Sequence, residues 1–359
     1  MKKFCVFCGK KPIDKNMEHV IPKWLIKATG DLKRDIGLGS CLNSNNDKER
    51  TFPFDNFKFP ACTACNDAFS KLESTVCYIM GNVLKNCPVS REEINCLLNW
   101  FDKVRIGIWL GFLYLDKNFF DIEPKFHIQS RLATDDRLLY IYKAKTAPRG
   151  VNFLGHVTPA FCFSPSCFVL RVNEFFFFNA SFQFLCAKGL GFPFARSMEI
   201  DQDGRFEIDL KPGTEKIKRP VIKWPSNDAC LEIYQPIFVR AKACQNAMAL
   251  YENEYVKKNS LDFSNCIGSI YWDKNDGIEL YPENSNAGWL NIKEHDFNDL
   301  IKILWKQTLD FQNNIHNMAS FENLKGDEGR ETRKIRAAIL KFNKEFKTKT
   351  EILPEWSYE

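Results

Sequence analysis

Two Cys-x-x-Cys pairs near the start of the chain are the residues best suited to hold a metal ion. Cys5-Val-Phe-Cys8-Gly9 and Cys62-Thr-Ala-Cys65 each place two thiols on one turn, and two such turns complete the tetrahedral four-sulfur shell of a structural zinc ion. The pairs are separated by 53 residues, more than in a zinc ribbon, which indicates a functional segment looped out between them. A redox Cys-x-x-Cys is the alternative, but that motif usually occurs once, in a thioredoxin-like context. We therefore expect a structural Zn²⁺ site.

A histidine beside a carboxylate lies inside this loop. Glu18 and His19 precede Val20-Ile21-Pro22, and His19 is the only histidine in the first 126 residues. Hydrolysis of a phosphodiester needs a base to activate water and a divalent ion to neutralise charge on the phosphate. Adjacent residues at the end of a strand point to opposite sides, so one can bind the ion while the other faces the water. A purely structural histidine is the alternative.

Oxygen-donating side chains follow the second cysteine pair. A helix that begins near Thr63 places Asn66, Ser70 and Glu73 on one face, at spacings of four and three residues. Oxygen ligands suit Mg²⁺ or Mn²⁺ better than zinc. A solvated helix face is the alternative for Ser70 and Glu73, whereas Asn66 directly follows a zinc ligand and is favoured as a functional residue.

Together these motifs resemble the zinc-containing HNH (ββα-metal) endonucleases over residues 1–85, through Cys-x-x-Cys, Glu-His-x-Ile-Pro and Cys-x-x-Cys-Asn. The resemblance implies two antiparallel strands and a helix around a catalytic Mg²⁺ or Mn²⁺ ion. It makes His19 the general base and Glu18 and Asn66 ligands of the ion, with Glu18 at a position that is usually Asp. Because the base must be neutral, activity is expected to fall below about pH 6.

The middle Asn of the family is the weakest part of the match. It belongs on the second strand, a few residues before the third cysteine, where it orients the base histidine. Asn56 is the best candidate, but it lies one position early and Phe57 occupies the expected place. The alternatives are Asn43, Asn45 and Asn46.

Charge and composition limit the partners and the compartment. Residues 1–88 hold 14 Lys and Arg against 9 Asp and Glu, which accounts for the whole net charge of +5. This excess favours nucleic acid, and its candidate contacts are Lys10, Lys11, Lys23 and Lys71. The longest apolar run, Ile106 to Leu115, has half of the roughly twenty residues of a membrane span. With no export signal and most of the 14 cysteines scattered singly, we expect a cytoplasmic protein without a membrane partner.

The order of predicted elements indicates an α+β protein with a helical C-terminus. We expect an HNH nuclease domain (1–88), an α+β domain (89–290) and a helical segment (291–359). Predicted helices cover Thr63 to about Lys85, a stretch opened by a Ser90–Glu93 capping box and ending near Tyr114, Ala241 to Tyr255, Asp296 to His316 and Glu328 to Lys347. Predicted strands include His127 to Ser130, Leu138 to Tyr142, Cys167 to Val172, Glu174 to Phe178 and Phe182 to Cys186.

The sequence therefore predicts a metal-dependent endonuclease that hydrolyses DNA, with RNA not excluded and with bacterial defence against phages as a fitting role. A zinc-stabilised nucleic-acid-binding module without catalysis is the alternative. Residues 89–359 would supply specificity, regulation, a homo-oligomer contact or a partner-protein contact. The basic last helix is a further candidate for phosphate contacts or, alternatively, a solvated face; its cations are Arg330, Arg333, Lys334, Arg336, Lys341 and Lys344.

Overall fold

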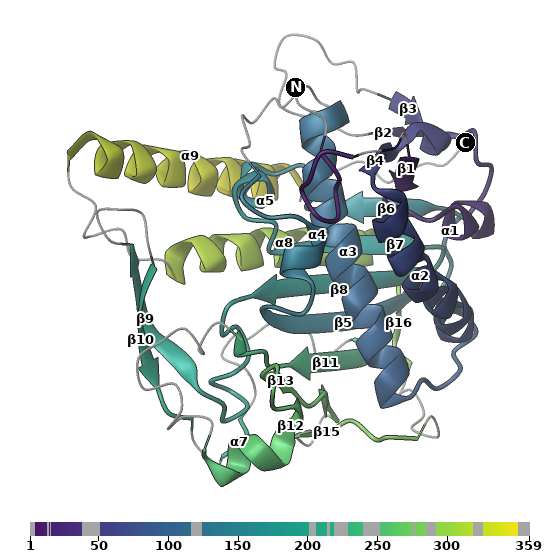
Figure 1. Cartoon of the computed structure of the whole chain (residues 1–359). Coiled ribbons are helices and arrows are strands. Elements are labelled where there is room, and N and C mark those ends of the chain that lie inside the picture. Colours follow the sequence, from purple (N-terminus) through teal and green to yellow (C-terminus); the bar gives the residue numbers. More distant parts are fainter. Residues whose placement is uncertain are drawn as a thin grey trace.

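A computed structural model describes residues 4–12, 14, 16–37, 51–115, 124–200, 206–213, 216–218, 229–239, 252–274, 277–284, 292–318 and 326–350. It is a mixed α+β fold in which helices pack on a large, mainly antiparallel sheet and helices form the C-terminal part (Figure 1). The predicted fold class is confirmed at this level. Among the described residues no helix combines the length and apolar character needed to cross a membrane.

The helices differ widely in length, and four of those in the described residues (α2, α3, α8 and α9) exceed twenty residues. They are α1 (Lys23–Ala28), α2 (Thr63–Leu84), α3 (Arg91–Leu115), α4 (Ile128–Arg131), α5 (Pro159–Phe163), α7 (Glu254–Asn259), α8 (Phe297–Met318) and α9 (Gly326–Thr350). A short 3-10 helix covers Phe54–Asn56.

The strands form one large sheet and several two-stranded ones. They are β1 (Asn16–His19), β2 (Asp35–Gly37), β3 (Thr51–Pro53), β4 (Lys58–Ala61), β5 (Asp136–Ala144), β6 (Val151–Leu154), β7 (Cys167–Val172), β8 (Phe175–Phe182), β9 (Phe194–Ile200), β10 (Phe206–Lys211), β11 (Leu231–Gln235), β12 (Ser260–Asp262), β13 (Ile267–Gly268), β14 (Tyr271–Asp273), β15 (Ile278–Leu280) and β16 (Glu294–His295).

The large sheet has eight strands, in the order β15-β14-β11-β5-β8-β7-β6, with β16 pairing with β5 outside this path. All neighbours are antiparallel except β16, which runs parallel to the end of β5. The two-stranded pairs are β1-β4, β2-β3, β9-β10 and β12-β13. β1 and β4 are short, so their position depends on what packs against them.

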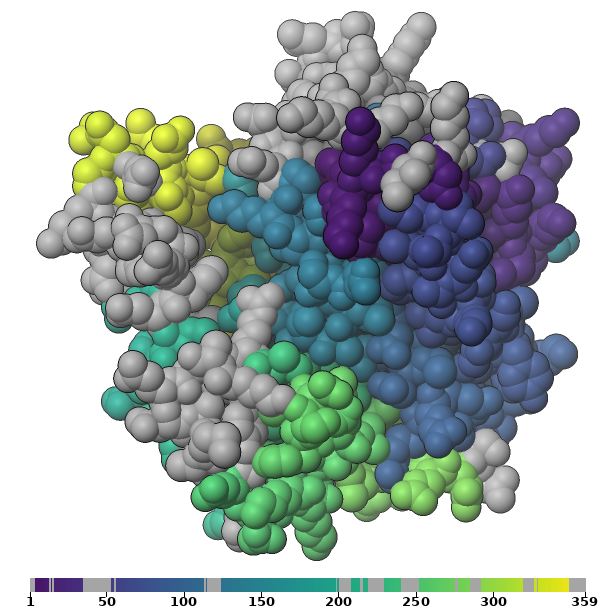
Figure 2. Space-filling view, viewed as in Figure 1, coloured from purple at the N-terminus to yellow at the C-terminus, as the bar shows by residue number. Residues whose placement is uncertain are grey.

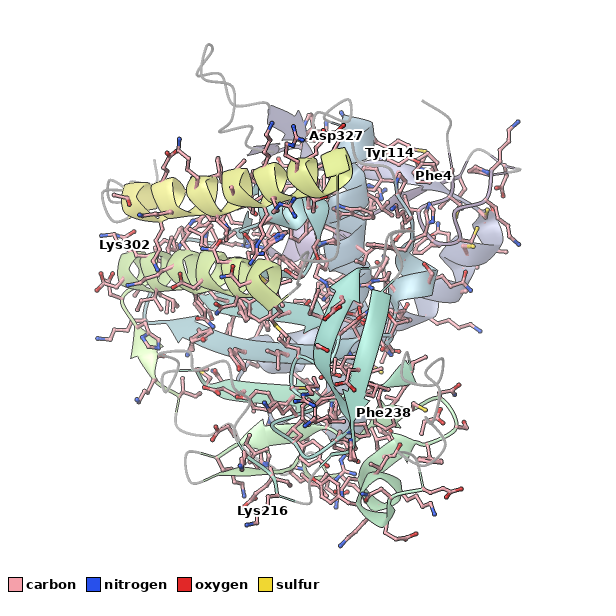
Figure 3. All side chains as sticks on the ribbon, turned by 90° about the vertical axis from the view of Figure 1, so that its left-hand side faces the viewer. Phe4, Tyr114, Lys216, Phe238, Lys302 and Asp327 are labelled. Atoms are coloured by element: carbon pink, nitrogen blue, oxygen red, sulfur yellow. The ribbon has the colours of Figure 1, made fainter. Side chains whose placement is uncertain are left out.

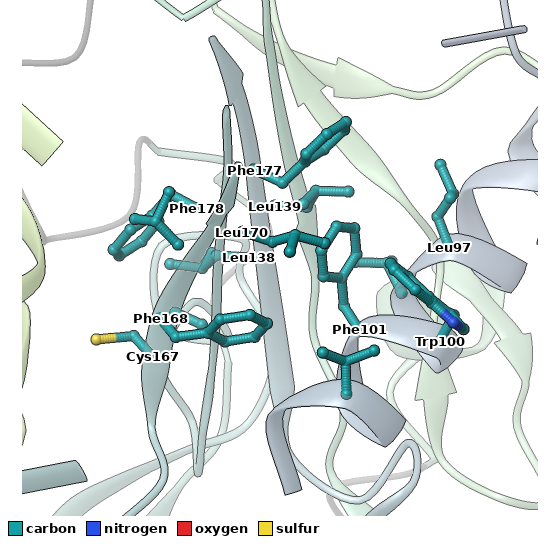
Figure 4. Close-up of a cluster of buried hydrophobic side chains, with 14 of the residues drawn as sticks. Leu97, Trp100, Phe101, Leu138, Leu139, Cys167, Phe168, Leu170, Phe177 and Phe178 are labelled. Carbon is teal, nitrogen blue, oxygen red and sulfur yellow. The ribbon is translucent and has the colours of Figure 1, made fainter. Parts of the chain in front are cut away.

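Helices cover both faces of the large sheet because its central strands are apolar on both. Side chains alternate along a strand, and the neighbours Phe177 and Phe178 of β8 therefore point to opposite faces. Phe177 contacts Phe101 of α3, with 5.6 Å between ring centroids, and Phe178 contacts Phe311 of α8, also at 5.6 Å. Figure 4 shows this core, with Leu97, Trp100 and Phe101 of α3 on one side of the strands and Cys167 and Phe178 on the other.

The helix α3 begins as its sequence predicts. The Ser90 backbone N–H donates to Glu93 Oε2 (2.6 Å), and the Glu93 N–H donates to Ser90 Oγ (3.2 Å). This reciprocal pair satisfies donors that the first helical turn leaves open. The predicted helix from Thr63 to about Lys85 is likewise confirmed as α2, and the last two predicted helices are confirmed as α8 and α9.

A buried polar layer interrupts the apolar contact between α3 and the sheet. Asp102 Oδ1 accepts from Arg105 (2.6 Å), and Asp102 Oδ2 accepts from Arg137 of β5 (3.3 Å). Arg137 also donates to Asn99 (2.6 Å) and to Gln235 of β11 (2.5 and 2.9 Å). Buried charges require such pairing, and the layer ties α3 to the central strands.

Two predicted strands are wrong. Ile128–Arg131 is a single helical turn, whereas the sequence predicts a strand from His127 to Ser130; the N–H groups of Ile128 and Gln129 bind the carbonyls of Val6 and Phe7. The predicted strand from Phe182 to Cys186 is a turn that follows the longer β8. Most of the predicted Ala241–Tyr255 helix lies outside the described residues.

One hydrophobic core runs through all three predicted domains. Its buried members extend from Cys5 in the first segment to Ile315 in α8. Trp24 of α1 lies beside Trp100 of α3, with 6.3 Å between ring centroids and 36° between ring planes. Figure 2 shows the purple N-terminal residues directly against the blue residues that follow them. The division at residues 88 and 290 stays a prediction.

Candidate metal centre and adjoining histidine

The first cysteine pair lies on a tight turn fixed from several sides. The Gly9 N–H donates to the Cys5 carbonyl (2.9 Å), and Gly9 has a φ of +74°, in the region that favours glycine. The Val6 N–H donates to the Pro60 carbonyl of β4 (3.0 Å). Just before the turn, the hydroxyl of Tyr114 at the end of α3 donates to the Phe4 carbonyl (2.9 Å; Figure 3).

The second cysteine pair stands where β4 passes into α2. Cys62 is the residue before the first turn of α2 and Cys65 lies within that turn. The Cys62 N–H donates to Cys5 Sγ (3.2 Å), which joins the two turns directly. Asp14 accepts from the N–H of Thr63 (3.3 Å) and from its hydroxyl, and so caps the start of the helix.

The four sulfurs form a cluster compatible with structural zinc. The Sγ atoms of Cys5, Cys8, Cys62 and Cys65 lie within 4.8 Å of one another, and Cys8 Sγ is 4.0 Å from Cys62 Sγ. A tetrahedral ion with Zn–S bonds of about 2.3 Å separates its sulfurs by about 3.8 Å, so a small contraction suffices. Over the described ranges, no other group of three or more His, Cys, Asp or Glu side chains converges in this way.

Electrostatics in the cluster also suits a bound cation. Burial, followed by the neighbouring Cys5 and Cys8 sulfurs, raises the pKa of Cys62 to about 11 and the pKa of Cys65 to about 12. Burial opposes ionisation of Cys5 too, but backbone N–H groups outweigh it and lower the Cys5 pKa. Four adjacent thiolates repel one another unless a cation binds them, and zinc binding therefore displaces thiol protons.

Glu18 and His19 lie on β1, which pairs antiparallel with β4. Glu18 is opposite Phe59 and His19 is opposite Lys58. Glu18 is buried and His19 is half-buried, as expected for neighbours that point to opposite sides of a strand. The cross-strand pairing places Lys58 beside His19, a neighbour that no sequence motif predicts.

Three of the four predicted oxygen ligands have other partners in the structure. Glu18 Oε1 lies 2.5 Å from the ammonium of Lys103 on α3, and Glu73 Oε1 contacts the same ammonium. Ser70 is exposed, and its hydroxyl donates to the Asp67 carbonyl (2.7 Å) in its own helix. Glu73 is thus bound to a lysine and Ser70 to its own backbone, and their role as metal ligands stays a prediction.

The remaining predicted ligands are Glu18 and Asn66. Burial raises the pKa of Glu18, Lys103 opposes this rise and Glu73 adds to it. Asn66 is half-buried in the first turn of α2, and its N–H donates to the Cys62 carbonyl (2.9 Å). Lys103 contacts one oxygen of Glu18, and Mg²⁺ needs as few as one or two protein carboxylates beside water and phosphate.

Asn56, the best candidate for the middle Asn, does not lie on a strand. Asn56 is exposed and ends the 3-10 helix Phe54–Asn56, whereas β4 begins at Lys58. Phe57 between them is buried and packs on Phe59, with 5.3 Å between ring centroids. The alternatives Asn43, Asn45 and Asn46 lie outside the described residues.

The predicted phosphate-contacting lysines all reach solvent. Lys10, Lys11, Lys23 and Lys71 are exposed around α1, α2 and the two Cys-x-x-Cys turns, which we call the first knuckle (Cys5–Cys8) and the second knuckle (Cys62–Cys65). Of the cations on the last helix, Arg330 pairs with Asp327 (3.4 Å) and Lys341 with Glu345 (3.9 Å), both at the surface. Exposed pairs of this kind are typical of a solvated helix, so the described contacts of α9 do not single it out as a nucleic-acid surface.

Lys103 is the site residue that the sequence did not reveal. It stands in an apolar helical stretch together with Asp102 and Arg105, and charges in such a stretch signal buried pairing. The partner of Lys103 could not be read from the sequence, because Glu18 is 85 residues away.

Comparisons give no relative from which a role can be transferred: no protein-family model, no curated protein and no solved structure matches this chain.

Proposed function

We propose that this protein is a metal-dependent phosphodiester hydrolase of the HNH type, acting on DNA. One observation carries the proposal: β1, which bears His19, pairs antiparallel with β4, β4 leads into α2, and the four-cysteine cluster lies at the junction of β4 and α2. We interpret these elements as the ββα arrangement that the resemblance implies. A site for hydrolysis needs a base at the surface on a rigid support, and half-buried His19 on a strand tied to the cluster meets that need.

His19 is proposed as the general base. Its neutral imidazole would take a proton from the attacking water. Lys58, which pairs with His19 on the facing strand, would contact a phosphate. Asn66 and one oxygen of Glu18 would hold a Mg²⁺ or Mn²⁺ ion. When bound, such an ion neutralises the charge that develops on the phosphate and on the leaving oxygen.

A non-catalytic, zinc-stabilised nucleic-acid-binding module is the second candidate. The observation that favours it is the ion pair between Glu18 and Lys103, which engages the predicted acidic ligand. In that case the exposed lysines around the knuckles would bind phosphates and His19 would have no chemical role.

Cleavage assays separate the two candidates. Purified protein is incubated with plasmid, linear duplex DNA, single-stranded DNA and RNA, each with Mg²⁺, Mn²⁺ or EDTA. We expect metal-dependent cleavage, and we expect His19→Ala to reduce it by about 10²–10⁴-fold. His295→Ala, on β16 of the large sheet, is the matched control and should cleave like the wild type. Binding without cleavage would favour the second candidate, and wild-type cleavage by His19→Ala would refute the base assignment.

A further inference from the structure

Lys103 belongs to α3, outside the segment that resembles a nuclease, yet it reaches into that segment. Its side chain is 1% exposed, and its ammonium contacts Glu18 of β1 and Glu73 of α2. The same ammonium lies 5.8 Å from the ring centroid of Phe7, between Cys5 and Cys8. One cation therefore contacts the first knuckle, the strand that carries His19 and the helix that follows the second knuckle.

Two glycines continue this contact along α3. Gly107 and Gly111 follow Lys103 at intervals of four residues and so lie on the same helix face. A Cβ on Gly107 would come within 2.9 Å of Val20, the residue after His19, and a Cβ on Gly111 would come within 2.9 Å of Phe59 on β4. We call Lys103, Gly107 and Gly111 the α3 stripe. Because the two glycines lack side chains, the stripe leaves room for Val20 after β1 and for Phe59 of β4.

The seating of the two strands depends on the elements that pack against them, because β1 and β4 have four residues each and form a sheet of their own. A two-stranded pair of this length is marginal in water. The anchor at Glu18 therefore determines how β1 is seated, and His19 follows on the opposite side of the strand.

We infer that Lys103 is a positioning residue for the proposed nuclease site, and that α3 is a structural part of that site and not of a separate domain. The kinetic part of this inference rests on the proposed function. Lys103 is too deeply buried to meet a substrate, so it acts through Glu18 and the seating of β1. It also gives Glu73 a role other than metal binding, as the second counter-ion of Lys103.

The test compares wild-type protein with Lys103→Met, Lys103→Arg and the control Lys306→Met, an exposed lysine of α8. Lys103→Met should lower kcat by about 10–100-fold, as loss of a residue that orients a site residue does, with KM within about twofold because the substrate contacts are intact. Lys103→Arg keeps the charge and should recover part of kcat. Lys306→Met should match the wild type.

Hydrogen exchange measured by mass spectrometry tests the positioning without any activity. Peptides that cover β1 should exchange at least about tenfold faster in Lys103→Met than in the wild type, while peptides from β7 and β8 should not change. If the Met variant does not fold, Lys103→Gln takes its place.

The outcomes separate the two ideas. A wild-type protein that cleaves nothing refutes the proposed function and leaves the exchange result to decide the role of Lys103. A folded Lys103→Met variant with wild-type exchange in β1 overturns the inference, whether or not the protein cleaves. So does loss of kcat without faster exchange in β1.

Discussion

Substituting Gly9 with alanine tests whether the first knuckle needs the backbone and the space that the structure gives it. Gly9 has a φ of +74°, and an added Cβ would lie 2.5 Å from His127 Nδ1 and 2.6 Å from its Cε1. The left-handed backbone alone costs a non-glycine residue about 1–2 kcal/mol. Overpacking against a held side chain adds about 1–3 kcal/mol. We expect Gly9→Ala to lower the free energy of unfolding by about 2–5 kcal/mol.

His127 cannot easily move away. Its ring meets Phe4 edge-on at 4.9 Å between centroids, and its backbone N–H donates to Ser130 Oγ (2.9 Å). The double variant Gly9→Ala/His127→Ala removes the clash and keeps the backbone strain. The loss of unfolding free energy caused by Gly9→Ala should therefore be smaller in the His127→Ala background than in the wild type. The difference between the two losses measures the steric contribution, about 1–3 kcal/mol.

Gly81 supplies the matched control. It lies within α2, and an added Cβ there meets no atom within 4 Å. The same substitution should therefore stabilise the protein, by about 0.5–1 kcal/mol, because alanine favours a helix. Urea denaturation of the zinc-loaded protein measures both variants, and a chromogenic chelator measures how readily each releases zinc. Unfolding free energies for Gly9→Ala and Gly81→Ala within about 0.5 kcal/mol of each other would refute the reasoning.

Three further predictions concern the cluster and the core. Cys62→Ser removes a thiolate ligand and should reduce bound zinc well below the one ion per chain expected of the wild type, as metal analysis will show. His156 is buried and burial lowers its pKa to about 3, so its neutral form is favoured in the fold and stability is lost as pH falls below about 6.5. His156→Leu should remove this loss of stability, which amounts to about 2 kcal/mol at pH 5. If the unfolding free energies of the variant and the wild type change equally between pH 8 and pH 5 in denaturation curves, the prediction is contradicted. Arg137→Met removes one of the two cations that pair with Asp102, whose other partner is Arg105, and leaves the side-chain oxygens of Asn99 and Gln235 without their donor. It should cost about 3–5 kcal/mol in urea denaturation, and a cost below about 1 kcal/mol would contradict the pairing.

The elements that the sequence predicts well are those whose signals are local. The Ser90–Glu93 box opens α3 because both partners lie within one turn, and the run of phenylalanines in β8 has the composition of a strand buried on two sides. The predicted strand from His127 to Ser130 was wrong. Its residues favour a strand locally, but hydrogen bonds to Val6 and Phe7 hold them as the helical turn α4. Tertiary contacts of that kind override propensity.

In the candidate site, too, the features with local signals could be predicted and those that depend on distant contacts could not. The spacing of Cys5, Cys8, Cys62 and Cys65 predicts the sulfur cluster, because each half-site is a local turn. The face shared by Ser70 and Glu73 follows from helical periodicity, but their bonding does not. Glu73 binds the ammonium of Lys103 on another helix. Helical periodicity relates residues within one helix, so it could not predict this partner.

The Trp24–Trp100 pair gives the molecule an optical reporter of how its first segment is seated. The rings belong to α1 and α3, and their centroids are 6.3 Å apart with 36° between the planes. Two indoles so close and so inclined couple their electronic transitions, and the resulting circular-dichroism couplet vanishes when the chromophores separate. Loss of that couplet ahead of the far-ultraviolet signal during unfolding would show the N-terminal segment leaving α3 before the sheet melts. The Trp24→Phe variant, which lacks the indole pair, gives the reference spectrum without the couplet.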